Sequence, residues 1–202
     1  MTSNVLLIDN LDSFTFNLVE AFQRLGCMVR TVRNGIAAAD ALAMAEGSGA
    51  LIVLSPGPGG PAGAGCCLEL IGLAIGRVPL LGICLGHQAI VERAGGRICR
   101  ADQPVHGKAS LLEHDGAGPF AGLKAPLRIG RYHSLCTREV PGRFTVHAAI
   151  DGMAMAISDP VARQTGLQFH PESILTTYGD LLLANFLNQA GPPILMPLQS
   201  AA

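Results

Sequence analysis

The first half of the chain alternates short, wholly apolar runs with longer segments in which apolar residues recur at helical spacing. Val5–Ile8 is apolar at every position, which favours a strand that is buried on both faces of a parallel sheet. In the next segment, Phe14, Leu18, Phe22 and Leu25 recur every three to four residues, and this period predicts a helix. The chain therefore starts with a strand that is followed by a helix.

The same alternation continues through four strand–helix units. We predict strands over Val5–Ile8, Met28–Val32, Ala50–Leu54 and Pro79–Ile83, and helices over Phe14–Leu25, Ala37–Ala45, Cys67–Ile75 and Gly86–Arg93. Asp12 or Ser13 is expected to cap the first helix. Strands that alternate with helices in this way predict an α/β fold with a mainly parallel sheet and helices on both faces.

The second half of the chain has a different pattern. Between residues 97 and 157, short alternating segments are broken by proline and glycine, which is typical of antiparallel strands; they include Pro126–Ile129, Phe144–Ala149 and Met153–Ile157. A further strand over Gly166–His170 and a helix over Leu181–Asn188 are expected to follow. We expect one domain over residues 1–190 and a proline-containing tail over residues 191–202.

Composition narrows the class of protein. Of the 202 residues, 49% are apolar and 14% are charged, so the chain can bury a core, and its charged share is well below the usual value of about 25%. This low charge suggests that a partner covers part of the surface. The formal net charge of −1 argues against binding to nucleic acid or to anionic membranes, because both need a basic surface.

No segment of the sequence points to export or to a membrane. The longest apolar runs, such as Val78–Leu81, are far shorter than the ~18 residues of a membrane span. The N-terminus has neither a basic region nor a cleavage signature, so we expect a cytoplasmic protein. There is no Cys-x-x-Cys pair, no metal site is expected, and most of the cysteines are predicted to be small buried apolar residues; they are Cys27, Cys66, Cys67, Cys84, Cys99 and Cys136.

Cys84 is set apart by its neighbours. The segment Gly82–Gly86 lies between a predicted strand and a predicted helix and has the Gly-x-nucleophile-x-Gly spacing of a nucleophile elbow. Small residues on each side allow a strained turn, and a helix N-terminus favours the thiolate. The N–H of Leu85 would point towards a developing oxyanion. A buried cysteine on a glycine-rich turn has the same spacing, so the pattern alone leaves both interpretations open.

A thiolate nucleophile needs a histidine that takes up and returns a proton. Among the six histidines, only His170 lies at a predicted strand end with a carboxylate, Glu172, two residues later. Side chains two positions apart on an extended chain face the same side, so Glu172 could orient the His170 ring as in a Cys-His-acid triad. A surface pair would give the same pattern, and the spacing does not show whether Cys84 and His170 meet.

Two other segments have an unusual composition. Ser55–Pro61 lacks the Gly-Lys-Ser/Thr sequence of a phosphate-binding loop, but Gly57 and Gly59 could present backbone N–H groups to an oxyanion. Arg131–Leu135 is polar and aromatic in a weakly charged chain, and its composition assigns it no task. His87 follows the elbow, where we expect it to cap the helix or to pack.

Six motifs occur in order along the chain, namely Leu6–Thr15, Ser55–Gly59, Gly82–Gln88, His106–Lys108, Arg131–Leu135 and Gln168–Ser173. Together they resemble the class I (triad) glutamine amidotransferases, and the similarity covers the chain from about residue 4 to residue 188. Within that family the chain is most similar to the small glutaminase subunit (component II) of anthranilate synthase and to its counterpart in aminodeoxychorismate synthase. The fold is therefore expected to be flavodoxin-like, with the additional antiparallel strands in the second half.

The resemblance implies a role for each matching residue. Cys84 would attack the side-chain amide of glutamine and form a thioester, His170 would protonate the leaving ammonia and then activate water, and Glu172 would orient His170. Backbone N–H groups of Leu85 and Gly57 would form the oxyanion hole. The implied set that binds L-glutamine and the oxyanion is Gly57, Pro58, Gly59, Leu85, Gln88, Ser134 and Leu135.

The resemblance also implies a partner. The ammonia would pass to a chorismate-using synthase subunit, which in anthranilate synthase is component I. No cofactor is implied for the present chain, whereas the partner synthase is expected to need Mg²⁺. The segments Ser55–Gly59 and Ile174–Gly179 resemble the anthranilate branch more, although in some bacteria one such subunit serves both pathways. A non-catalytic scaffold and a stand-alone cysteine hydrolase are the alternatives; the intact triad argues against the first, and Gln88 and Ser134 argue against the second.

Overall fold

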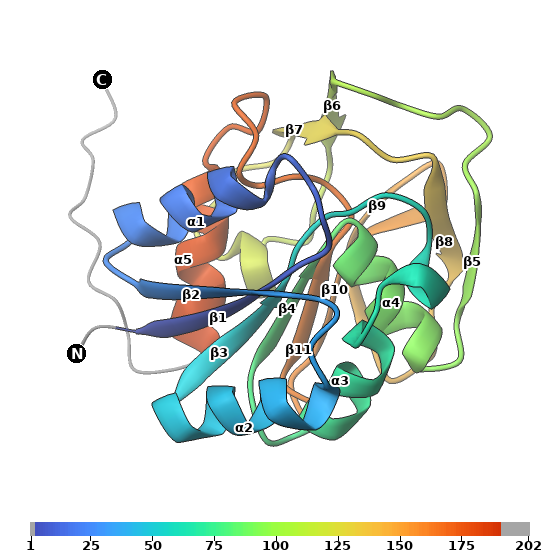
Figure 1. Cartoon of the computed structure of the whole chain (residues 1–202). Coiled ribbons are helices and arrows are strands. Elements are labelled where there is room, and N and C mark those ends of the chain that lie inside the picture. Colours follow the sequence, from blue (N-terminus) through green and yellow to red (C-terminus); the bar gives the residue numbers. More distant parts are fainter. Residues whose placement is uncertain (1–2, 191–202) are drawn as a thin grey trace.

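A seven-stranded sheet runs through the middle of the protein in the order β2-β1-β3-β4-β11-β10-β9 (Figure 1). The computed structural model describes residues 3–190. The first five strands in that order are parallel, and β10 and β9 add an antiparallel edge. The strands are β1 (Asn4–Asp9), β2 (Met28–Arg33), β3 (Ala50–Leu54), β4 (Leu80–Ile83), β9 (Thr145–Ile150), β10 (Met153–Asp159) and β11 (Gln164–Leu167).

Helices cover both faces of this sheet (Figure 1). One face carries α1 (Thr15–Arg24) and α5 (Gly179–Ala190), and the other carries α2 (Ala38–Ser48), α3 (Cys67–Ala74) and α4 (Leu85–Arg93). Successive residues of β1 alternate between the two apolar layers, because Val5 and Leu7 pack with α1 and α5 whereas Leu6 and Ile8 pack with α2, α3 and α4. A strand buried on both sides is apolar at every position. The predicted α/β class is confirmed.

Two short antiparallel pairs lie beyond the main sheet. One joins β5 (Arg97–Arg100) to β8 (Leu135–Glu139), and the other joins β6 (Lys108–Leu112) to β7 (Leu127–Arg131). Two single 3₁₀ turns, η1 (Pro61–Gly63) and η2 (Gly118–Phe120), complete the elements. The prediction of additional antiparallel strands is confirmed, although β5, β6 and β8 were not separately predicted because many of their residues are exposed and alternate only weakly.

The strand predicted over Gly166–His170 is misplaced. The observed strand β11 ends at Leu167, and His170 lies beyond it in an isolated bridge to Gly130. The boundary depends on β4, because Leu167 pairs with Ile83 at the end of that strand and both segments leave the sheet there. His170 therefore lies in the connection that follows β11 and is not part of the seven-stranded sheet.

The ends of two helices also differ from the predictions. The structure begins α1 at Thr15, one residue later than predicted, and Phe14 just before it provides no side-chain cap. Of the two predicted caps, Asp12 closes the turn that leads into the helix, because its Oδ1 accepts a hydrogen bond from the Phe14 N–H at 2.7 Å and its carbonyl accepts one from the Thr15 N–H at 3.2 Å. The helix α2 continues to Ser48 and ends at Gly49, whose φ of 62° suits glycine.

Two predictions concerned the ends and the apolar runs of the chain. The tail predicted over residues 191–202 lies outside the described residues. Within residues 3–190, none of the helices combines the length and the apolar character that crossing a membrane requires.

Candidate active site

Cys84 occupies the sharp turn between β4 and α4. Its backbone has a φ of 52° and a ψ of −98°, a conformation that L-residues rarely adopt and that the surrounding structure must hold in place. A Cβ atom at Gly82 would overlap the carbonyl group of Gly86, and one at Gly86 would lie 2.6 Å from the Leu54 carbonyl oxygen. Both positions need glycine because backbone segments touch there, as they do in a nucleophile elbow.

We expect Gly82→Ala to lower the free energy of unfolding by about 1–3 kcal/mol, because the added methyl group must displace the backbone of the elbow. Gly47→Ala is the matched control. A Cβ at Gly47, inside α2, meets nothing within 4 Å, so this change is expected to leave stability unchanged or to raise it by up to ~1 kcal/mol. Urea unfolding of both variants provides the measurement. Equal stability of Gly82→Ala and the wild type would contradict the close backbone approach.

The register between β4 and β11 places Gln168 beside Cys84. Leu167 pairs with Ile83 in the parallel ladder, so the next residue of each segment leaves the sheet at the same level. The Cys84 N–H donates to the Leu167 carbonyl at 2.8 Å, and Gln168 Nε2 donates to Cys84 Sγ at 3.6 Å. Gln168 belongs to one of the six motifs, but nothing local in the sequence indicates that it reaches the cysteine.

His170 and Glu172 form a buried pair, so the alternative of a surface pair is wrong. Nδ1 of His170 lies 2.7 Å from Oε1 of Glu172, and their side chains are 2% and 0% exposed. The other ring nitrogen, Nε2, makes no hydrogen bond of ordinary geometry with residues 3–190. One nitrogen of the ring is therefore held by the carboxylate, and the other is available to a reacting group.

The electrostatic surroundings favour a protonated His170. Burial disfavours the charged imidazolium, but the Glu172 carboxylate and the Cys84 side chain outweigh this effect and raise the pKa of His170 to about 10. The elbow and the segment that carries His170 are adjacent because the Cys84 N–H bonds the Leu167 carbonyl, three residues before His170. A histidine cation near a cysteine stabilises the thiolate, so this arrangement can hold a thiolate–imidazolium pair.

Two aromatic rings enclose His170. The ring centroids of Tyr132 and Phe14 lie 4.8 and 5.1 Å from that of His170, and the Tyr132 hydroxyl lies 3.0 Å from Ser173 Oγ. These contacts hold the imidazole in place and shield it from water. Both aromatic residues lie in the six motifs, yet nothing local in the sequence indicates that they touch the histidine.

The loop after β3 packs against the elbow. A Cβ at Gly57 would lie 2.7 Å from Leu85 Cδ2 and 2.6 Å from Asn10 Cβ. Asn10 anchors this loop, because its N–H donates to Ser55 Oγ and its Nδ2 donates to the Ser55 carbonyl, both at 2.8 Å. Gly57 thus lies next to Leu85, the first residue of α4, whose N–H has no acceptor within the helix. Asn10 also lies in one of the six motifs, but no local pattern indicates that it bonds Ser55, 45 residues later.

The remaining residues expected to bind glutamine are divided between the inside and the rim of the site. Gln88 is buried, and its Nε2 donates to the Leu135 carbonyl at 3.2 Å, so these two residues lie together. The Ser134 side chain is exposed. Pro58 and Gly59 are also exposed and form the outer part of the loop, where Gly59 has a φ of 77°.

Two other histidines near the elbow are unsuited to proton transfer. Burial lowers the pKa of both His87 and His133 to about 4, and the Arg131 charge adds to the effect at His133. Neither ring nitrogen of His87 makes a hydrogen bond of ordinary geometry in the described part of the chain. A ring that stays neutral at physiological pH does not form the imidazolium that a Cys–His pair uses, which leaves His170.

Two of the other cysteines, Cys27 and Cys136, are poorly suited to act as nucleophiles. All six are free thiols, and burial raises the pKa of Cys27 and of Cys136 to about 11 in each case. Such thiols are poorly ionised at neutral pH and therefore unreactive. Across residues 3–190, no three His, Cys, Asp or Glu side chains are grouped as a metal site requires.

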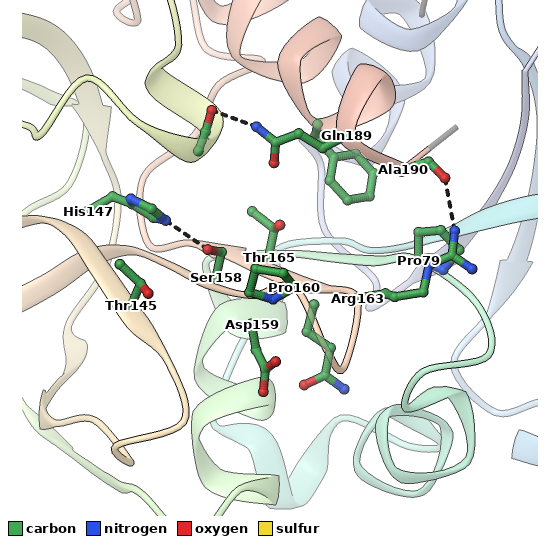
Figure 2. A pocket seen from close by; sticks show the side chains of 13 residues that line it. Pro79, Thr145, His147, Ser158, Asp159, Pro160, Arg163, Thr165, Gln189 and Ala190 are labelled. Atoms are coloured by element: carbon green, nitrogen blue, oxygen red, sulfur yellow. Dashed lines mark hydrogen bonds between the residues drawn. The ribbon is translucent and has the colours of Figure 1, made fainter. Parts of the chain in front are cut away.

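A cavity of about 520 Å³ lies near the start of β4, and His147, Ser158 and Gln189 are among the residues that line it (Figure 2). Pro79, just before β4, lines it, whereas Cys84 follows the other end of the same strand. Its buried histidine, His147, is already engaged, because Nε2 lies 2.7 Å from Ser158 Oγ and Nδ1 lies 2.8 Å from Asp115 Oδ2. This cavity is separate from the candidate active site.

The comparison with known families agrees with this site. The family model described as glutamine amidotransferase class-I matches residues 6–190, which include the elbow and the His170–Glu172 pair. The chain belongs to this family.

Several named proteins are similar to this chain over most of its length. It is 51% identical to the anthranilate synthase component 2, pyocyanine specific, of Pseudomonas aeruginosa, over 93% of this chain and 94% of that protein. It is 46% identical to anthranilate synthase component 2 of Vibrio parahaemolyticus, over 93% and 96%. The crystal structure of a Thermoplasma acidophilum protein, assigned to GMP synthase, superposes with a TM-score of 0.82 and 23% identity over 94% of both chains, which supports the fold.

Proposed function

We propose that this chain is the glutaminase component of an anthranilate synthase. It hydrolyses L-glutamine and passes the ammonia to a chorismate-using synthase component, which makes anthranilate for tryptophan biosynthesis. The observation that carries the proposal is Cys84 on its strained elbow beside the buried His170–Glu172 pair. Family membership and the similarity to proteins named anthranilate synthase component 2 support it. Because those relatives carry that name, a role in aminodeoxychorismate synthesis is not favoured.

The first half-reaction forms a thioester. The Cys84 thiolate attacks the side-chain amide carbon of glutamine, and negative charge develops on the amide oxygen. The N–H groups of Leu85 and Gly57 stabilise this oxyanion. The C–N bond then breaks as the His170 imidazolium gives its proton to the leaving nitrogen, which departs as ammonia. Cys84 retains the γ-glutamyl group.

The second half-reaction releases glutamate. His170, now neutral, removes a proton from a water molecule, whose oxygen attacks the thioester carbonyl carbon. The same oxyanion donors act again, and the Cys84 sulfur leaves as a thiolate beside the protonated His170. Glu172 orients the ring and stabilises its charge in both half-reactions. We assign no cofactor to this chain, and the expected Mg²⁺ requirement to the partner synthase.

The partner is proposed to dock at the edge of the sheet that carries Cys84. Exposed apolar surface of this kind is typical of protein–protein contacts. Two segments, residues 11–16 and residues 170–178, flank this edge. The Phe14 ring of the first segment contacts the His170 ring of the second. Their large apolar side chains are between 57% and 98% exposed: Leu11, Phe16, Tyr178 and Ile174.

The isolated chain is expected to be a poor glutaminase, and docking of the synthase component is expected to raise kcat/KM by about 10²-fold or more. The reason is the loop Ser55–Pro61, whose glycines allow more than one backbone state. An oxyanion donor that points away typically costs ~10²–10³ in kcat, and a partner that binds the competent state shifts the population towards it. Glutaminase kinetics during titration with an anthranilate synthase component I provide the measurement.

The same titration distinguishes the alternatives. With glutamine and chorismate, the complex is expected to produce anthranilate, and a parallel reaction with the aminodeoxychorismate synthase partner is the control. If the complex with the aminodeoxychorismate synthase partner formed its product and the complex with component I formed no anthranilate, the anthranilate assignment would be contradicted. Equal kcat/KM before and after titration would contradict activation by docking and indicate a free-standing glutaminase.

We also propose that the protein works in the cytoplasm. All six cysteines are free thiols, and the Sγ atoms of Cys99 and Cys136 remain unbonded at 3.8 Å. Unbonded neighbouring thiols suit a reducing compartment. Fractionation of the source cells tests this location.

A further inference from the structure

Gln168 is wholly buried, and both ends of its side-chain amide are engaged. Its Nε2 lies 3.6 Å from Cys84 Sγ, and its Oε1 lies 3.2 Å from Gln88 Nε2. Neither the formation nor the hydrolysis of the thioester, as described so far, involves this amide. A buried amide needs hydrogen-bond partners for its N–H and C=O groups. One of the partners of Gln168 is the sulfur of the nucleophile, and this choice of partner has a chemical consequence.

Neighbouring groups determine which end of each amide faces which partner. The Leu135 carbonyl oxygen can only accept, so Gln88 must turn its Nε2 towards it. The second N–H of the same nitrogen donates to Gln168, which must therefore offer Oε1 at that contact. The Nε2 of Gln168 is then directed at Cys84. This direction follows from a backbone carbonyl and does not depend on an arbitrary choice of amide orientation.

A second series of hydrogen bonds holds the same carbonyl. Arg131 Nε donates to His133 Nε2 at 3.2 Å. Because a guanidinium only donates, Nε2 accepts, and the proton of the neutral ring lies on Nδ1. Nδ1 then donates to the Leu135 carbonyl at 3.0 Å. The network has one consistent orientation, and it ends with an N–H that points at the Cys84 sulfur.

We propose that Gln168 is a further catalytic residue, which donates a hydrogen bond to the Cys84 sulfur, stabilises its thiolate and holds it in place for attack on the substrate. Gln88 is the positioning residue that orients Gln168. A hydrogen bond to a charged acceptor is stronger than one to a neutral acceptor, so this bond favours the ionised sulfur. The inference rests on the proposed function only in taking Cys84 as the nucleophile.

Two substitutions remove the donor in different ways. Gln168→Glu keeps the shape of the side chain and still accepts from Gln88, but it places a carboxylate oxygen at Cys84. Gln168→Met keeps the length and has no N–H. The rate at which iodoacetamide alkylates Cys84, followed by peptide mass mapping as a function of pH, reports thiolate formation. The native titratable groups around the elbow, His170, Glu172, His87 and His133, are kept in both variants. Gln168→Glu adds one carboxylate to them, whereas Gln168→Met adds none, so a shift that both variants share reports the lost N–H.

In both variants the pH midpoint of alkylation is expected to rise by about one unit, so that alkylation is about tenfold slower at pH values below both midpoints. Gln164→Met is the matched control, because Gln164 is a buried glutamine at the start of β11 whose amide bonds the Ile71 carbonyl and Arg143 instead. It is expected to keep the wild-type midpoint. A wild-type midpoint in both Gln168 variants, or an equal shift in the control, would overturn the proposal.

Glutaminase kinetics of the complex with the synthase component give an independent measurement. The Gln168 variants are expected to lose about tenfold in kcat with a smaller change in KM, since thiolate chemistry and not binding is affected. A raised KM with unchanged kcat would overturn the proposal in favour of a packing role. Alkylation needs neither glutamine nor a partner, so a chain that shows the pH shift without hydrolysing glutamine would contradict the proposed function and still support the assignment of Gln168.

Discussion

Replacement of Cys84 by serine is expected to lower glutamine-dependent product formation by at least about 10³-fold, while synthesis from free ammonia by the same complex continues. A serine hydroxyl is hardly ionised at neutral pH, and loss of a nucleophile removes the thioester route altogether. The synthase site receives ammonia directly in the second assay and does not depend on Cys84. Anthranilate formation with glutamine and with ammonium salt gives the two rates.

Cys27→Ala is the control for this experiment. Cys27 is buried in the core, and the raised pKa of its thiol leaves it unreactive, so its loss is expected to leave both rates close to wild type. A glutamine-directed electrophile is expected to label Cys84 before the other cysteines. Near-native glutaminase turnover in Cys84→Ser, or first labelling of Cys66 or Cys136, would show that the nucleophile is wrongly assigned.

The second large effect is expected from Glu172→Gln, which should lower kcat/KM by roughly 10³–10⁴-fold. The carboxylate and Cys84 together raise the pKa of His170 to about 10 against the effect of burial. Without the carboxylate, burial lowers the pKa of His170, and the imidazolium is lost at neutral pH. The ring then neither supports the thiolate nor protonates the leaving ammonia. A pH–rate profile, together with an NMR titration of His170, provides the measurement.

The same substitution is expected to change how stability depends on pH. Because the folded state holds the His170 proton more tightly than the unfolded chain, whose histidine titrates near pH 6.5, the pair stabilises the fold fully below that pH. This stabilisation is lost as the pH rises from about 6.5 through about 10. Urea unfolding at several pH values should show that decline in the wild type and a weaker one in Glu172→Gln.

Glu113→Gln serves as the control, since Glu113 is exposed and is expected to leave both the rate and the pH dependence unchanged. If Glu172→Gln kept the wild-type pH–rate profile, the carboxylate would not set the charge of His170. The catalytic group would then be a dyad of Cys84 and His170.

The fold could be predicted where its signals are local. Val5–Ile8 is apolar throughout because β1 buries side chains on both faces, and Gly82 and Gly86 are glycines because the backbone touches itself at the elbow. Prediction was less accurate where pairing sets a boundary. The strand placed over Gly166–His170 ends at Leu167, since its partner β4 ends at the same level.

The candidate active site shows the same division between features set by local sequence and features set by strand pairing. The sequence by itself determined the α/β class, the glycine spacing around Cys84 and the two-residue spacing of His170 and Glu172, because each depends on residues close together in the chain. Only the tertiary structure decided that these segments form one site with Gln168. The order of strands places β11 next to β4, and strand order results from the packing of the whole chain, which no local period of apolar residues encodes.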